Sequence, residues 1–149
     1  MIYLLIVFVI ALALAPLVHF VPSKRQREQA RLREYAAVHG LFVEFRQLPE
    51  TGRAAAARQS GRIGDTIYYG KRLTPRQAGS VQAGAWRRDA QGWRSVRGGA
   101  TVPAALEQLP PAILAASADG HSCGVYWREV GGAETVHQIV QVLDAWSGP

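Results

Sequence analysis

Residues suited to nucleophilic chemistry gather in the segment Asp119-Gly120-His121-Ser122-Cys123-Gly124, at the start of a predicted strand. A cysteine thiolate activated by a neighbouring imidazole is an effective nucleophile. However, residues two apart on an extended chain point the same way without touching, and no sequence signature of a cysteine enzyme surrounds this pair. We therefore favour a turn in which Cys123 is a small apolar residue, and we expect no catalytic residue. A cysteine-dependent enzyme that uses Cys123 and His121 is the alternative.

The spacing of the histidines does not indicate a metal site. His19, His39, His121 and His137 lie singly, without a paired-histidine spacing or a Cys-x-x-Cys motif. No glycine-rich phosphate loop occurs, and the acidic residues are dispersed. We predict that the chain binds no metal and no cofactor.

Aromatic and basic residues alternate around the turn at 89–92. Trp86-Arg87-Arg88 precedes this turn and Trp93-Arg94 follows it, which predicts a β-hairpin. Such a composition is typical of platforms for single-stranded nucleic acid. Because side chains alternate along a strand, Trp86 and Arg88 share one face and Arg87 lies on the other. If the tryptophans face the core, the arginines stack on them or face water. We favour this interpretation, with anionic lipid and nucleic acid as alternatives and nucleic acid as the disfavoured partner.

The remaining pattern predicts an α+β fold with a mainly antiparallel sheet and C-terminal helices. Ser23 and Gln26 have the spacing of a capping box, and Gly40 follows the helix that they begin. Val136, Ile139, Val140 and Leu143 form one apolar stripe, which predicts that the last helix packs on the sheet. The predicted helices are 24–39, 103–109, 111–118 and 133–146. The predicted strands are 41–46, 66–69, 85–88, 93–96 and 124–130. Residues 53–64 are predicted to form a loop with a helical turn at 54–58.

The N-terminus has the composition of a membrane span. Residues 1–21 contain no charged side chain, and 2–21 would form roughly 30 Å of helix, the thickness of a hydrocarbon core. Five basic residues follow at 24–33, so the positive-inside rule places the N-terminus outside and the body in the cytoplasm. We predict a transmembrane anchor (1–22), a basic juxtamembrane helix (23–40) and an α+β cytoplasmic domain (41–149) in a single-pass protein of the inner (plasma) membrane. A cleaved signal peptide is the alternative.

The chain is basic overall, with a formal net charge of +6 from 17 basic and 11 acidic residues. Basic residues beside a span can meet anionic lipid headgroups. The candidate contacts for an anionic surface are Lys24, Arg25, Arg27, Arg31, Arg33, Arg87, Arg88 and Arg94.

The predicted membrane exit, Phe20-Val21-Pro22-Ser23-Lys24-Arg25-Gln26-Arg27-Glu28, resembles that of YajC-type proteins, which are accessory subunits of the bacterial preprotein translocase. The shared features are a short N-terminal span, a proline at the exit and a basic helix, and they cover residues 1–35. The body from Leu41 onward departs from the family, so no functional residue is transferred. The resemblance implies a small membrane-anchored accessory or scaffold protein of bacteria. Such a protein would present a cytoplasmic binding domain near the bilayer to a membrane-protein partner.

Overall fold

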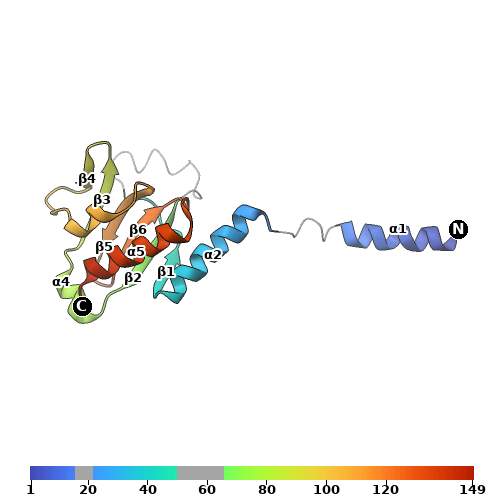
Figure 1. Ribbon diagram of the computed structural model, residues 1–149, viewed down its shortest axis with the longest axis horizontal. Helices are drawn as coiled ribbons and strands as arrows, with labels where there is room; N and C mark the ends of the chain where they lie inside the picture. Colours follow the sequence, from blue (N-terminus) through green and yellow to red (C-terminus); the bar gives the residue numbers. More distant parts are fainter. Residues whose placement is uncertain (16–21, 50–65) are drawn as a thin grey trace. The chain divides into compact units, whose positions relative to one another are not determined.

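A computed structural model describes residues 1–15, 22–49 and 66–149 of the chain (Figure 1). The chain divides into two compact units, Met1–Ala30 and Arg31–Pro149. The boundary falls within helix α2 (Lys24–Val38), so the two halves of this helix belong to different units.

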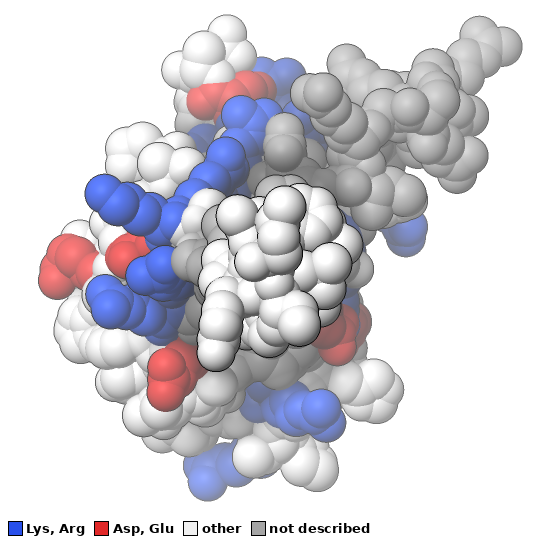
Figure 2. All heavy atoms as spheres, turned by 90° about the vertical axis from the view of Figure 1, so that its right-hand side faces the viewer, with Lys and Arg blue, Asp and Glu red and all other residues white. Residues whose placement is uncertain are grey.

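The N-terminal unit begins with helix α1 (Ile2–Leu14), which is apolar on every side. None of its residues is buried, and Figure 2, in which this helix faces the viewer, shows no charged side chain on it. With 13 residues, α1 is roughly 20 Å long, whereas a hydrocarbon core is about 30 Å thick.

The prediction of a transmembrane anchor at 1–22 is therefore wrong. Among residues 1–15, 22–49 and 66–149, no helix is both long enough and apolar enough to cross a membrane. The predicted single-pass location in the bacterial inner membrane, with the N-terminus outside, is overturned by the same finding. The apolar composition was read correctly, but the helix ends at Leu14.

Helix α2 begins at the predicted capping box. The backbone N–H of Ser23 donates to Oε1 of Gln26 (2.8 Å), and the N–H of Gln26 donates to Oγ of Ser23 (3.2 Å). At the other end, Gly40 adopts φ +78°, the left-handed conformation that commonly ends a helix. Leu32 and Ala36 are the buried residues of α2.

The second unit is built on one antiparallel six-stranded sheet with the strand order β1-β2-β6-β5-β3-β4. The α+β class with a mainly antiparallel sheet is thus confirmed. The strands are β1 (Leu41–Glu44), β2 (Ile67–Arg72), β3 (Gly84–Asp89), β4 (Gly92–Ser95), β5 (Ile113–Ala118) and β6 (Ser122–Trp127).

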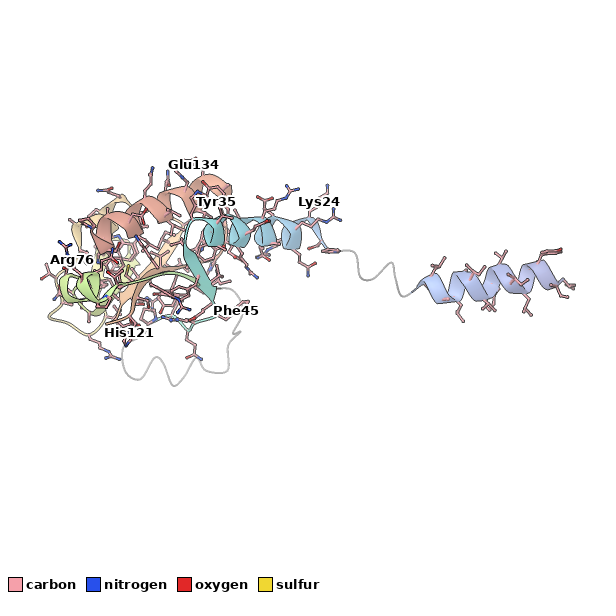
Figure 3. The ribbon with its side chains drawn as sticks, turned by 90° about the horizontal axis from the view of Figure 1, so that it is seen from below. Lys24, Tyr35, Phe45, Arg76, His121 and Glu134 are labelled. Atoms are coloured by element: carbon pink, nitrogen blue, oxygen red, sulfur yellow. The ribbon has the colours of Figure 1, made fainter. Side chains whose placement is uncertain are left out.

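Helix α5 (Gly132–Ser147) covers one face of the sheet, which we call the inner face (Figures 1 and 3). Its predicted apolar stripe is confirmed, since Val136, Ile139, Val140 and Leu143 are all buried in the main core. Two short helices, α4 (Pro75–Ser80) and η2 (Ala104–Gln108), also contact α5.

The opposite, outer face carries a separate aromatic cluster built around Tyr68 and Tyr126. Gly70 and Gly124 lie directly opposite each other on β2 and β6, and the ring of Tyr68 lies over both glycines. Any side chain at either glycine would occupy the space that this ring fills. The two glycines therefore leave free the space that the Tyr68 ring occupies.

Three local predictions were wrong or incomplete. The segment predicted as a helix at 111–118 contains β5, and the helix predicted at 103–109 is the short 3-10 helix η2. Helix α4 was not predicted, although Thr74 and Gln77 form a capping box at its start. The loop predicted at 53–64 lies outside the described residues.

Candidate functional site

The structure does not bring the Cys123 thiol and the His121 imidazole together. Cys123 lies in the main core with no exposed surface, and burial raises the pKa of its thiol to about 11. His121 is exposed in the loop before β6 (Figure 3). A buried, neutral thiol is a poor nucleophile because the thiolate is the reactive form.

The loop around His121 has a structural role instead. Oδ1 of Asp119 accepts hydrogen bonds from the backbone N–H groups of His121 (2.8 Å) and Ser122 (2.7 Å). Burial alone would raise the pKa of Asp119, but these donors outweigh it and lower the pKa. The polar residues of this segment therefore form the turn between β5 and β6.

The eight basic residues proposed for an anionic surface fall into different settings. Lys24, Arg25 and Arg27 are exposed in the N-terminal unit, and the Lys24 side chain is drawn in Figure 3. In the second unit, Arg31 is exposed on α2, Arg33 is in an ion pair, and the other three belong to the β3–β4 hairpin. These three are Arg87, Arg88 and Arg94.

Arg33 binds a buried carboxylate that sequence analysis did not identify. Its Nε and Nη2 donate to the two carboxylate oxygens of Glu129 at 2.7 and 2.8 Å, and the Tyr69 hydroxyl donates to Oε1 at 2.9 Å. The Glu129 side chain is only 3% exposed, and its backbone adopts φ +54°, which is unusual for a residue other than glycine. Burial and this carboxylate together raise the pKa of Tyr69. Because both carboxylate oxygens of Glu129 have a donor, we interpret this network as a structural contact that holds the second half of α2 in place.

The predicted hairpin is confirmed, and its tryptophans face the inner side of the sheet. Trp86 is fully buried and packs edge-on against Trp146 of α5, with ring centroids 5.6 Å apart. Nη1 of Arg88 donates to the carbonyl oxygens of Leu109 and Pro110, both at 2.9 Å. The preferred interpretation, in which the tryptophans belong to the core, therefore agrees with the structure.

Inward-facing side chains of the hairpin form what we call the donor patch, which consists of Trp86, Arg88, Trp93 and Ser95. In the register, Trp86 is opposite Ser95 and Arg88 is opposite Trp93. The Arg88 guanidinium lies 5.7 Å from the centre of a Trp93 ring. Arg87 and Arg94 face the other side of the sheet, where Arg94 forms an exposed ion pair with Asp89 (3.2 Å).

Three of the four residues in the donor patch have a polar atom that is buried without a hydrogen-bond partner. Within the described ranges, five side-chain atoms are in this situation, and three of them are Nε1 of Trp86, Nε1 of Trp93 and Oγ of Ser95. A buried donor without an acceptor costs about 1–3 kcal/mol. Their concentration in one hairpin distinguishes it from the rest of the described fold.

The backbone beside these donors is also unpaired. Directly opposed residues of an antiparallel pair alternate between exchanging two hydrogen bonds and exchanging none. The N–H of Val96 donates to the carbonyl of Ala85 (2.8 Å), so Ala85 and Val96 form a hydrogen-bonded pair. By alternation, the opposed pairs Trp86–Ser95 and Arg88–Trp93 exchange no backbone hydrogen bonds. The N–H and C=O groups of Trp93 and Ser95 therefore point away from β3. Because β4 is the last strand of the sheet, no strand of the described chain pairs with that side.

Sequence analysis found the hairpin but not its open edge or its unpaired donors. Strand order depends on contacts between distant segments, and the alternation of residue types gives no sign of it. A metal site was not expected, and the described residues contain no group of three or more potential metal ligands. No family model, curated protein or solved structure matches the chain. The similarity of 20–28 to YajC-type proteins accordingly stays a prediction.

Proposed function

We propose that this chain is a non-enzymatic accessory protein that binds an extended segment of a partner protein as an added strand beside β4. One observation carries the proposal: the backbone groups of Trp93 and Ser95 face an open sheet edge, next to unpaired donors on the same two residues. In strand addition, backbone hydrogen bonds supply affinity, and contacts to alternate side chains supply specificity.

The other functions considered are less well supported. A cysteine-dependent enzyme would need Cys123 accessible and paired with a base, whereas its thiol is buried and apart from His121. A platform for single-stranded nucleic acid would need exposed rings on which bases stack, whereas Trp86 has no exposed surface. The arginines of the hairpin are also divided between its two faces, so they do not form one basic surface.

Site-specific photo-cross-linking in living cells tests the proposal. We place benzoylphenylalanine at Arg94, which is exposed on β4, and expect a discrete adduct with one partner protein. The same probe at Glu134, which is exposed on α5, should not form that adduct.

Substitutions at Ser95 then ask whether the open backbone edge is responsible. The N–H of Ser95 makes no bond to β3, so Ser95→Pro should leave the hairpin folded, as proline does on edge strands, but abolish the adduct. Ser95→Ala keeps this N–H and should retain the adduct. Absence of an adduct from position 94, its survival in Ser95→Pro, or the same adduct from position 134 would each overturn the proposal.

A further inference from the structure

We infer that the segment bound beside β4 is acidic and places a carboxylate against the donor patch. This inference rests on the proposed function and specifies the partner chemistry that the same edge selects. Two observations support it: the donor patch contains unpaired hydrogen-bond donors, and the hairpin has more basic than acidic residues.

The donor patch offers hydrogen-bond donors and very few acceptors. An indole N–H and a guanidinium can only donate, and a serine hydroxyl can do so as well. Within the donor patch, Nη1 of Arg88 donates to the carbonyl oxygens of Leu109 and Pro110, and these two bonds hold the guanidinium in place beside Trp93. A carboxylate accepts several hydrogen bonds at once, and it would satisfy the unpaired Trp93 and Ser95 donors that a neutral apolar side chain would leave unpaired.

The charge of the hairpin favours the same ligand. Residues 84–97 contain Arg87, Arg88, Arg94 and Arg97 but one acidic residue, Asp89. Asp89 already forms an ion pair with Arg94. An acidic strand is therefore attracted to this edge. A second copy of the same edge would bring like charges opposite each other, which destabilises strand pairing.

Two matched peptides test the inference on the full-length chain. The first is the capped hexapeptide Thr-Glu-Thr-Glu-Thr-Glu, and the second has Gln in place of each Glu. Signals of the side-chain indole N–H groups and of the β4 backbone amides are followed by NMR during each titration. Because charge-assisted hydrogen bonds are about twice as strong as neutral ones, we expect the Glu peptide to bind about tenfold more tightly.

The expected shifts are confined to one part of the molecule. The indole N–H signals of Trp86 and Trp93 should move with the Glu peptide, whereas that of Trp127, which is also buried and unpaired but lies on β6, should not. Trp93→Phe keeps an aromatic ring and removes one donor, so it should reduce the preference for Glu over Gln several-fold. Ser95→Ala should reduce it in the same direction.

The outcomes separate this inference from the proposed function. If both peptides shift the β4 amides with equal affinity, or if Trp93→Phe keeps the full preference, the carboxylate inference fails and strand addition stands. If neither peptide shifts the backbone amides of Trp93 and Ser95, the proposed function itself fails. If those amides move on dilution of the chain alone, the edge pairs with a second copy, and the acidic partner is excluded.

Discussion

Replacement of Arg33 by methionine tests the network that ties the second half of α2 to the body. The change keeps an apolar side chain of similar length and removes the guanidinium. The Glu129 carboxylate, 3% exposed, then keeps the Tyr69 hydroxyl as its only described side-chain donor. Removing one partner of a buried ion pair costs about 3–5 kcal/mol. Because the Arg33 side chain is 36% exposed, water can replace part of its contribution, and we expect about 3 kcal/mol.

Urea unfolding of the full-length chain, followed by tryptophan fluorescence, measures this loss. The midpoint should fall while the slope of free energy against urea stays unchanged, because the surface exposed on unfolding is the same. For a unit of this size the melting temperature should drop by about 10 °C.

The double variant Arg33→Met/Glu129→Met provides the control. It removes both charges, so its loss should be smaller than the sum of the two single losses. If Arg33→Met unfolds within about 0.5 kcal/mol of the parent, the range for an ordinary surface change, then the ion pair contributes no more than an exposed one and our reasoning is refuted.

Three further predictions concern the core and its chemistry. Ile139→Ala should lower the free energy of unfolding by about 2–5 kcal/mol because the side chain is fully buried. Gln141→Ala, at an exposed position on the same helix, should change it little, and urea unfolding measures both variants. The pKa of Cys123 is raised to about 11 in the folded chain, so a disulfide reagent should label it slowly from pH 7 to 9. Stability should fall above about pH 9, where the unfolded thiol ionises first; rapid labelling at pH 7 would contradict this. Gly124→Ala should cost about 1–3 kcal/mol because its Cβ would fall onto a neighbouring tyrosine ring, whereas Gly120→Ala has open space and should be nearly neutral in the same urea assay.

Local signals in the sequence were sufficient for several elements. Period and spacing identified α5, the capping box at Ser23, and the hairpin, because each depends on residues close together in the chain. Strand β5 was mistaken for a helix because Ile113-Leu114-Ala115-Ala116-Ser117-Ala118 follows a proline and is rich in helix-forming residues. Its position between β6 and β3 overrides that local preference, since the strand pairs along both sides.

The candidate site was predictable only in part. The hairpin, and the shared face of Trp86 and Arg88, followed from alternation along the strands, but alternation did not show which face lies on the core. The open edge did not, because it depends on β4 being the last strand of the sheet. The ion pair between Arg33 and Glu129 joins residues 96 positions apart, and no local pattern points to it. The membrane prediction rested on an uncharged stretch of 21 residues followed by five basic ones, whereas α1 ends at Leu14.

The arrangement of Tyr68 over Gly70 and Gly124 has a consequence for how this sequence can diverge. The ring and the two glycines share one volume, so a side chain at either glycine requires a smaller residue at position 68. We therefore expect related chains that keep a tyrosine at position 68 to keep glycine at positions 70 and 124. Loss of the Tyr68 ring alone should not admit larger residues, because the Phe42 ring also lies against Gly70 and the backbone oxygen of Tyr69 also lies against Gly124.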